Sequence, residues 1–491
     1  MSAPVFGALR SQDGVTFTVW APNAREVQLV LQDGAAAGTH PLARTDDGLF
    51  TTWTRGASAG DRYGYRLDGS EPRPDPASRY QPDGVHGPSQ VVDASRFEWH
   101  DGGWKARPAR DLIVYELHAG TFSPEGTFAG AQERLPYLRD LGVTAIELMP
   151  VADFAGNRNW GYDGVSLFAP SRAYGAPDDF RRLVDAAHAH GLSIILDVVY
   201  NHLGPEGACL PEFSSAYFTD RHRTPWGDAI NLDAPGSAIV RRFILDNALH
   251  WIREYHVDGL RLDATHTLID ESPRHIVQEI AQTVRAETGR PIVVHAEDHR
   301  NLAAMIEDPA AGGWGLDGVW ADDFHHVVRR MVAGDRDSYY ADFTGDAWEL
   351  ATILRQGWLY TGGHSAHMTG PRGTDPSRLP MHRFVVCVQN HDQIGNRPMG
   401  DRLHHSIPAE TWRAVSVLLL TAPMTPLLFM GQEWAASTPF QYFTDLEPGL
   451  GRQVTDGRRR EFADFPAFAD PAAREQIPDP QAETTFLSSR L

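Results

Sequence analysis

The stretch Asp258-Gly-Leu-Arg-Leu-Asp-Ala-Thr-His266 combines an apolar strand with two charged side chains. Gly259 to Asp263 is predicted to form a short buried strand, with leucines at its apolar positions. Arg261 and Asp263 stand two residues apart, so their side chains point to the same face of that strand. Because Arg261 would keep Asp263 ionised, this carboxylate could act as a nucleophile or a charge stabiliser. Taken alone, the stretch is equally consistent with a structural ion pair.

Eight runs of mostly apolar residues alternate with helical segments from Asp111 onward, and the stretch above contains one of them. The runs are Leu112–Leu117, Thr144–Met149, Ser193–Val199, Val257–Asp263, Pro291–Glu297, Gly318–Asp322, Phe384–Gln389 and Met424–Met430. Strands that are apolar throughout are buried on both faces, as parallel strands are. Eight strand–helix units predict a catalytic (β/α)8 TIM barrel over residues 111–435.

Residues 1–95 have a different pattern, with short alternating segments separated by Gly, Asp and Pro, and predict an N-terminal β-sandwich that resembles a carbohydrate-binding module. It could bind glucan or only brace the barrel. Its aromatic residues Trp20 and Trp53 sit in strands and are predicted to be core. Within it, Glu71–Ser95 is predicted to wrap onto the next domain. Residues 96–110 are predicted to form a linker and residues 436–491 a tail. We therefore expect a multidomain α and β protein.

Composition and charge narrow the range of partners. The chain has 44 Lys and Arg against 64 Asp and Glu, a net charge of −20, which argues against nucleic acid and anionic membranes. Its two cysteines, Cys209 and Cys387, provide neither a disulfide framework nor metal-ligand spacing. The amino terminus lacks the pattern of a signal peptide, and the longest apolar run, Val415–Met430, is too short and too interrupted to span a membrane. We therefore expect a cytoplasmic protein.

Carboxylates follow several predicted strands, at the end of a barrel where active sites form. Asp263 ends the fourth strand, Glu297 ends the fifth, and Asp392 follows the seventh. Such carboxylates suit cleavage of a glycosidic bond, in which one attacks the anomeric carbon while a protonated partner donates to the leaving oxygen. Asp263 is the better nucleophile, and burial should raise the pKa of Glu297, as an acid requires. Asp392 could offset charge on an oxocarbenium-like transition state.

Other polar side chains at these strand ends suit the binding of sugar hydroxyls, namely His202, His391 and Asn396. The run Asp322-Asp-Phe-His-His326 contains acids and histidines close together, so a metal site is an alternative there. It lacks the helical histidine pair of common zinc sites, and sugar binding is favoured.

Two further features leave alternatives open. Asp197 could react, or it could order the site through a salt bridge with Arg261. Trp160 and Tyr162 lie in a loop after the second strand, where they could stack on sugars or serve only to pack the loop.

Four of these strand ends resemble the signature regions of the α-amylase superfamily. They are Asp197–His202, Gly259–Asp263, His295–Glu297 and Asn390–Asp392. The resemblance implies a retaining mechanism on α-glucosidic bonds, with Asp263 as nucleophile, Glu297 as proton donor and Asp392 as transition-state stabiliser. It implies no cofactor and no metal.

Finer motifs resemble the maltooligosyltrehalose trehalohydrolase family within that superfamily. They are Asn159–Gly164, Arg261–His266, Ala296–Asn301, Asp322–His326, Asn390–Arg397 and Phe429–Trp434. The resemblance implies hydrolysis of the α-1,4 bond next to the terminal trehalose unit of maltooligosyl trehalose, with release of trehalose. It implies a substrate site lined by Arg261, Leu262, Ala264, Thr265, His266, Asp322, Asp323, Phe324, His325, His326, His391, Gln393, Ile394, Gly395 and Asn396, to which we add His202, Tyr162 and Trp160. The family usually ends in a further small β-domain, so the tail is expected to lead toward a domain absent from this sequence.

Two other functions are compatible with the same architecture. A glucan branching enzyme, which is a transferase, has a similar sandwich and barrel and would use the same three carboxylates. The stretches Asp322–His326 and Gln393–Arg397 favour the trehalose-releasing family over it. A non-catalytic glucan-binding protein on this scaffold should have lost one of the carboxylates, and all three are present.

Overall fold

The computed structural model describes residues 5–11, 13–463 and 466–491. The N-terminal segments form two four-stranded antiparallel sheets, with strand orders β1–β2–β6–β5 and β4–β3–β7–β8. Their bounds are β1 Gly7–Ser11, β2 Gly14–Trp20, β3 Val27–Leu31, β4 Gly38–Pro41, β5 Ala43–Arg44, β6 Leu49–Arg55, β7 Arg62–Leu67 and β8 Ser89–Gln90. Alternate residues of β3 are buried, as strands with one face on a core require. The predicted β-sandwich is confirmed.

Trp20 and Trp53 behave differently, although both are in strands of the sandwich. Trp20 is 3% exposed and packs edge-on against Tyr217 of the barrel domain, with ring centroids 5.0 Å apart. Trp53 is 52% exposed, so its prediction as a core residue was wrong. Trp20 is buried because its face of β2 meets the barrel domain, whereas Trp53 is exposed because its side chain on β6 faces solvent.

The eight apolar runs form a closed parallel barrel. Its strands are β9 Val114–Leu117, β10 Ala145–Leu148, β13 Ser193–Val198, β16 Gly259–Leu262, β17 Val293–Glu297, β18 Gly318–Trp320, β21 Phe384–Cys387 and β22 Thr425–Phe429. Each pairs with the next in this order, and β22 closes the ring on β9. Every residue of β9, β10 and β13 is buried, which is why these runs lack alternation. The predicted (β/α)8 TIM barrel is confirmed.

Helices surround the barrel, and two hairpins project above its carboxyl end. The main helices are α2 Leu135–Leu141, α3 Pro177–Ala189, α5 Ser237–Glu254, α6 Ile276–Thr288, α8 Asp323–Ala333, α9 Ala347–Gln356 and α11 Ala409–Thr421, and the shorter ones are α1 Phe128–Gln132, α4 Leu210–Phe213, α7 Ala303–Ile306 and α10 His391–Gly395. The hairpins are β11 Ala152–Phe154 with β12 Gly164–Pro170, and β14 Phe218–Thr224 with β15 Gly227–Ile230, while β19 His364–Ser365 pairs with β20 Gly370–Pro371. None of the helices in the described residues is long and apolar enough to cross a membrane.

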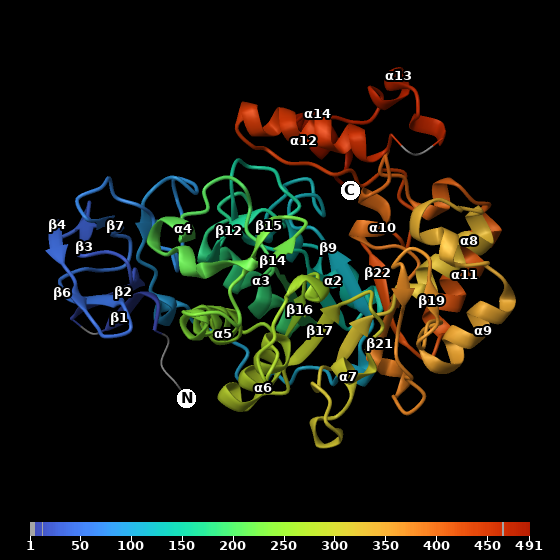
Figure 1. Ribbon diagram of the computed structural model, residues 1–491, viewed down its shortest axis with the longest axis horizontal. Coiled ribbons are helices and arrows are strands. Elements are labelled where there is room, and N and C mark those ends of the chain that lie inside the picture. The colour runs from blue at the N-terminus through green and yellow to red at the C-terminus, as the bar shows by residue number, and fades with distance from the viewer. Residues whose placement is uncertain (1–4, 12, 464–465) are drawn as a thin grey trace.

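The segment Glu71–Ser95 both completes the sandwich and contacts the barrel domain. Its residues Ser89–Gln90 form β8, which pairs with β7. Arg79 is buried, and its Nε lies 3.3 Å from Glu254 Oε1 on α5. The predicted linker after it is also packed, since Trp99 stacks on His256 with ring centroids 3.8 Å apart. The sandwich therefore lies against one side of the barrel, as Figure 1 shows.

Residues 436–491, expected as a tail, are folded over the carboxyl end of the barrel. They contain α12 Pro448–Glu461, α13 Pro471–Arg474 and α14 Glu483–Ser488, which lie at the top of Figure 1. Arg458 of α12 donates to the backbone oxygen of Arg397 at 3.1 Å. The final residue, Leu491, donates its backbone N–H to the oxygen of Thr121 at 2.9 Å. Buried aromatic side chains, among them Phe440 and Phe443, anchor this segment, so it belongs to the wall of the barrel mouth.

Candidate active site

Arg261 aligns three carboxylates at the carboxyl ends of neighbouring strands. Its Nη1 donates to Asp197 Oδ2 at 2.5 Å and to Asp263 Oδ1 at 3.0 Å. Its Nη2 donates to Glu297 Oε2 at 2.6 Å. The side chain is fully buried, and its guanidinium carbon lies 4.2 Å from the ring centroid of Trp320. The contact with Asp197 is the ordering salt bridge that the sequence left open as one of two alternatives.

Asp263 follows β16 directly and is held from a second side. Asn201 Nδ2 donates to Asp263 Oδ2 at 2.9 Å and to its backbone oxygen at 3.2 Å. The next residue, Ala264, has φ 40° and ψ 50°, a left-handed conformation that residues other than glycine rarely adopt. This turn places the Ala264 N–H 2.9 Å from Glu297 Oε2. A strained backbone position therefore connects the two carboxylates, as is common at functional sites.

Asp263 and Glu297 stand on adjacent strands at the same level of the barrel. Leu262 of β16 pairs with Ala296 of β17, and each carboxylate comes one residue later. Neighbouring strands lie about 4.8 Å apart. Retaining glycosidases place the two carboxyl groups about 5–5.5 Å apart, whereas inverting ones need about 6.5–9.5 Å. The register therefore favours the retaining arrangement.

The pKa directions of this pair are the reverse of those expected from the sequence. Burial and then the charge of Glu297 raise the pKa of Asp263 well above its ordinary value. Burial also acts to raise the pKa of Glu297, but Arg261 and the Ala264 N–H outweigh it and lower that pKa. The sequence places Arg261 beside Asp263 only, whereas the folded guanidinium also reaches Glu297 on the next strand. The surroundings therefore disfavour the ionised form of Asp263 and favour the ionised form of Glu297.

Asp392 lies on α10 beside a histidine that two carboxylates keep charged. Glu116 of β9 accepts from the backbone N–H of His391 at 3.0 Å, and its other oxygen lies 2.5 Å from His391 Nδ1. His391 Nε2 lies 2.8 Å from the Tyr162 hydroxyl and 3.5 Å from Asp392 Oδ1. Burial lowers the pKa of His391, but the charges of Asp392 and Glu116 outweigh it and raise that pKa to about 9. A protonated imidazole therefore stands beside Asp392 at neutral pH.

A cavity of about 200 Å³ opens beside Asp392. Its lining residues come mainly from the segments after β17, β18 and β21, and they are His299, Asp322, His326, Tyr339, Asp342, His367, Met368, Arg372, Asp392, Gln393 and Asn396. Burial and the charges of Glu297 and Asp392 raise the pKa of Asp322 to about 7. Acids, imidazoles, amides and a guanidinium thus surround one small space, which suits a ligand with many hydroxyl groups.

The expected substrate-site residues divide into two groups. Asp322, His326, Gln393 and Asn396 line the cavity together with Asp392, whereas Asp263 and Glu297 are not among its lining residues. Other side chains point into the core and do not line this cavity, namely Leu262, Phe324, His325 and Ile394. Asp323 is also fully buried, and its carboxylate contacts Asn301 and Arg372. Alternating positions on β16 and helical positions on α8 and α10 produce this division, because only part of each element faces the barrel mouth.

Thr265 and His266, which follow Asp263, contact the segment Glu297–His299. Thr265 Oγ1 donates to the Glu297 backbone oxygen at 2.8 Å and to Asp298 Oδ2 at 2.8 Å. The His266 ring lies 4.0 Å, centroid to centroid, from that of His299, which lines the cavity.

Trp160, Tyr162 and His202 serve different purposes. The Trp160 ring is buried and stacks on Phe440 with centroids 5.2 Å apart, and it packs behind Gly395, so its role is loop packing. Tyr162 stacks on His391 with centroids 5.1 Å apart, and its hydroxyl donates to Asp197 at 2.6 Å. His202 bonds the backbone oxygen of Tyr162 and stacks on Trp226.

Several residues of the site were not predicted. The cavity residues Tyr339, His367 and Arg372 come from the long segment between α8 and β21, where the sequence shows no motif. Glu116 was also missed, although a signal existed, because an acid inside the apolar strand Val114–Leu117 is expensive to bury without a partner.

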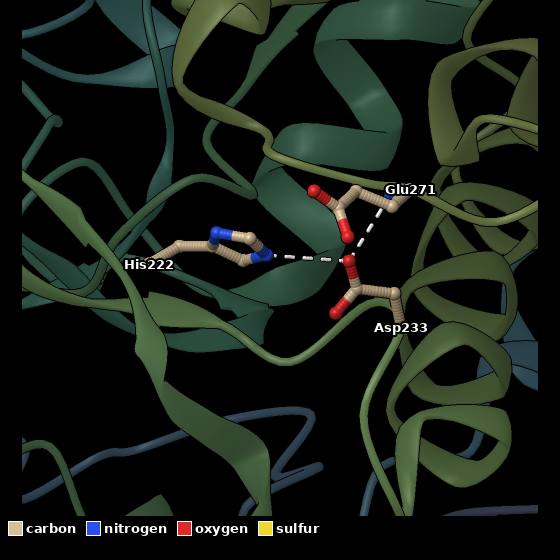
Figure 2. A group of neighbouring side chains, drawn as sticks. All are labelled: His222, Asp233 and Glu271. Carbon is tan, nitrogen blue, oxygen red and sulfur yellow. Dashed lines mark hydrogen bonds and ion pairs between the residues drawn. The ribbon is translucent and has the colours of Figure 1, made fainter.

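Among the residues that the structure describes, one group of three side chains has ligand atoms close enough to hold a metal ion. His222, Asp233 and Glu271 bring these atoms within 4.8 Å of one another, as Figure 2 shows. Arg221 pairs with both carboxylates, at 3.0 Å from Asp233 Oδ1 and 3.1 Å from Glu271 Oε2. This cation already compensates their charge, so we assign no metal to the group.

Comparison with known proteins identifies the family. Residues 5–82 match the family model of carbohydrate-binding module 48, the isoamylase N-terminal domain, and residues 85–225 match that of the α-amylase catalytic domain. A protein of Deinococcus radiodurans named malto-oligosyltrehalose trehalohydrolase is 46% identical over 483 residues, which are 97% of this chain and 77% of that protein. The chain belongs to the malto-oligosyltrehalose trehalohydrolase family. It is therefore a glycosidase of the α-amylase superfamily.

Two further similarities agree with this family. The malto-oligosyltrehalose trehalohydrolase of Saccharolobus solfataricus is 43% identical over 487 residues, covering 99% of this chain and 83% of that protein. The crystal structure of a protein from Salmonella typhimurium superposes with a TM-score of 0.93 at 44% identity, over 100% of this chain and 82% of that one.

Proposed function

We propose that the chain hydrolyses the α-1,4-glucosidic bond between the maltooligosyl part and the terminal trehalose unit of maltooligosyl trehalose, and so releases trehalose. The observation that carries this proposal is the alignment of Asp263 and Glu297 by one buried Arg261, in a chain of this family. Paired carboxylates on adjacent barrel strands provide the nucleophile and the acid that glycosidic cleavage needs.

The proposed reaction has two steps. Asp263 attacks the anomeric carbon while Glu297 gives its proton to the leaving oxygen, which departs as the hydroxyl of trehalose. Water then attacks the glycosyl–Asp263 ester, and Glu297 takes the proton of that water. The anomeric configuration is inverted twice and so retained.

Substrate binding must redistribute the proton between the two carboxylates. Glu297 contacts Arg261 and the Ala264 N–H, both of which stabilise its ionised form. A donor must be protonated, so Glu297 has to leave these contacts and take up the proton as the sugar enters. Arg261 then remains with Asp197 and Asp263, and the Asp263 carboxylate becomes the stabilised anion.

The cavity residues are proposed to hold the sugar. Asp392 would bind hydroxyls of the distorted ring and stabilise the oxocarbenium-like transition state. Its own orientation is fixed by Asn396, whose Nδ2 donates to Asp392 Oδ1 at 3.0 Å. Asp322, His326 and Gln393 offer further donors and acceptors around the same space.

Product analysis tests this function. The protein is incubated separately with maltooligosyl trehalose and with a plain maltooligosaccharide of equal length, and the released sugars are separated by chromatography. We expect trehalose from the first substrate and much slower cleavage of the second. New α-1,6 branches on amylose, without trehalose release, would identify a branching enzyme instead. Binding without any product would identify a non-catalytic glucan-binding protein.

Four further assignments complete the proposal. The net charge of −20 argues against nucleic acid as a partner, and we propose the cytoplasm as the location. We propose domain limits of 1–95 for the sandwich, 96–110 for the connection and 111–435 for the barrel. No cofactor and no metal enter the proposed reaction.

A further inference from the structure

Glu147 is a carboxyl group inside the barrel that the proposed reaction does not use. It lies on β10, two residues after Ala145, which packs in one apolar cluster with residues of β9, β13, β17, β18, β21 and β22. Residues from all these strands can meet only in the interior of the barrel. Alternate residues of a strand share a face, so Glu147 also points inward, one layer nearer the carboxyl end. It is 1% exposed.

The carboxyl group of Glu147 has no hydrogen-bond partner in the described part of the chain, and both of its oxygens are buried. Its neighbour on β9 is different. Glu116 pairs with Glu147 in the register of the two strands, and its two oxygens bond His391. A buried polar group that is left unbonded costs about 1–3 kcal/mol. Glu147 therefore needs an explanation that the packing of the barrel does not provide.

The surroundings of Glu147 favour its uncharged form. Burial and then the charge of Glu116 raise its pKa well above the ordinary value, and the charge of Asp197 adds to this shift. The charges of Arg261 and His391 oppose the shift without cancelling it. An uncharged carboxylic acid offers one O–H donor together with acceptor oxygens.

Two atoms of the neighbouring ion pair need such a group. Arg261 Nε and Asp197 Oδ1 are both buried, and among the described residues neither has a hydrogen-bond partner. The first is a donor and the second an acceptor, so an uncharged Glu147 complements both. Since neither atom bonds Glu147 directly, a bridging water is the link that satisfies all three groups. Buried waters typically make about three such hydrogen bonds.

We infer that an internal water molecule joins Glu147 to Arg261 and Asp197, and that Glu147 is a positioning residue for the guanidinium of Arg261. The inference rests on the proposed reaction. The terminal nitrogens of Arg261 align Asp263 and Glu297, and the link to Nε would stop the guanidinium from turning. A displacement of about 1 Å at a reacting group can cost about 100-fold in rate.

Two substitutions separate this role from a purely structural one. Glu147→Gln keeps an uncharged group with a donor and an acceptor, so kcat should stay within threefold of the parent. Glu147→Leu removes both, and we expect kcat to fall about tenfold or more while KM stays within threefold. Its thermal midpoint should not fall, because replacing an unbonded polar group by an apolar one of similar size is neutral or stabilising. Cys387→Ala, in the interior cluster on β21, is the control and should keep its kcat.

A high-resolution crystal structure of the parent chain tests the water directly. We expect one ordered water within hydrogen-bond distance of Glu147 and of Arg261 Nε, retained in Glu147→Gln and lost in Glu147→Leu. This water is visible whether or not the chain releases trehalose, so the inference and the proposed function fail separately.

Three outcomes would overturn the inference. One is a Glu147→Leu enzyme whose kcat is within threefold of the parent. Another is a Glu147→Gln enzyme as slow as Glu147→Leu, because a charged carboxylate would then be required. The third is a parent structure in which no ordered water lies between Glu147 and Arg261.

Discussion

At the scale of single residues, Arg261 is the group on which the site depends. Its two terminal nitrogens reach Asp197, Asp263 and Glu297, which lie on or directly after three different strands. Only a planar, forked cation can donate to all of them from one position, whereas a lysine ammonium is a single point charge. The geometry of the proposed nucleophile and the proposed acid is thus set by one side chain.

Replacing Arg261 with lysine keeps a positive charge but removes the forked guanidinium, and it should therefore disable the reaction. We expect Arg261→Lys to lower kcat by about 100-fold or more, the loss found when one preorganised donor is removed from a reacting group. Steady-state kinetics on maltooligosyl trehalose measures this loss. Arg73→Lys is the control, because Arg73 pairs with Glu212 on the surface. An Arg261→Lys enzyme within threefold of the parent would show that the fork is unimportant.

His391 predicts a pH dependence of stability. Its pKa in the folded chain is raised to about 9, above the ordinary 6.5. The protonated form is therefore favoured by folding, and its contribution is fully present below pH 6.5 and lost as pH rises through 9. The shift corresponds to a loss of about 3 kcal/mol in the free energy of unfolding. Denaturant titrations at pH 6 and pH 9.5 measure it.

The Glu116→Gln variant serves as the comparison for this prediction. It removes the carboxylate that bonds His391 Nδ1 and one of the charges that raise its pKa. The variant should lose less stability than the parent between the two pH values. An equal loss in both proteins would assign the pH dependence to other groups.

The sequence predicts which residues are present at the site better than it predicts their electrostatics. Strand ends rich in carboxylates identified Asp263 and Glu297, because charged groups after apolar strands are costly unless used. The pKa directions of the pair were wrong, since they depend on where the two ends of one guanidinium point. That orientation is fixed by the register of β16 and β17, which is a tertiary property.

At the scale of elements, the short helix α10 carries Asp392 and is positioned by its contact with Trp160. A Cβ added at Gly395 would lie 2.0 Å from the indole ring of Trp160. That ring cannot retreat, because it stacks on Phe440 and its Nε1 donates to the Gln441 oxygen at 2.9 Å. Glycine is therefore needed at this position for close approach rather than for backbone freedom.

Substitution at this contact should displace α10. We expect Gly395→Ala to cost about 1–3 kcal/mol of stability, as overpacking does, and to lower kcat by displacing Asp392. Gly457→Ala on α12 is the matched control, since nothing lies within 4 Å of its added Cβ. The control should keep full activity and gain about 0.5–1 kcal/mol, because alanine favours helix. Thermal denaturation and kinetics test both variants, and normal activity in Gly395→Ala would contradict this role of Trp160.

Element prediction succeeded where the apolar pattern was continuous and failed where it was not. All eight barrel strands were recognised, because runs buried on both faces are apolar throughout. Residues 436–491 were expected as a tail that leads toward a further domain, yet the described part of this segment folds over the rim. Their anchors, such as Phe443 packing on Phe486 with centroids 5.0 Å apart, join residues more than 40 positions apart and have no local signature.

At the scale of the whole molecule, the sandwich and the barrel share an apolar contact. Phe6 meets Phe243 of α5 edge-on with centroids 5.3 Å apart, and Trp20 meets Tyr217. Arg79 adds a buried ion pair to Glu254. Such a contact should couple the unfolding of the two parts.

Weakening this contact should destabilise the molecule as a unit. We expect Phe6→Ala to cost about 3–5 kcal/mol, as other buried aromatic truncations do, and to lower the midpoint of a single thermal transition. Trp53→Ala is the control, because Trp53 is 52% exposed on β6. Calorimetry measures both variants. Two separate transitions in the parent chain would show that the sandwich does not brace the barrel.

The proposed reaction depends on a covalent bond between the sugar and Asp263. Glu297→Gln removes proton donation and the later base, so with a glycosyl fluoride, which needs no acid to leave, the intermediate should form and accumulate. Mass spectrometry of the digested protein measures this directly. We predict a glycosyl adduct on the peptide that contains Asp263, and none when Asp263→Asn is added. An adduct on another residue, or turnover without any adduct and with an inverted anomeric product, would contradict the account.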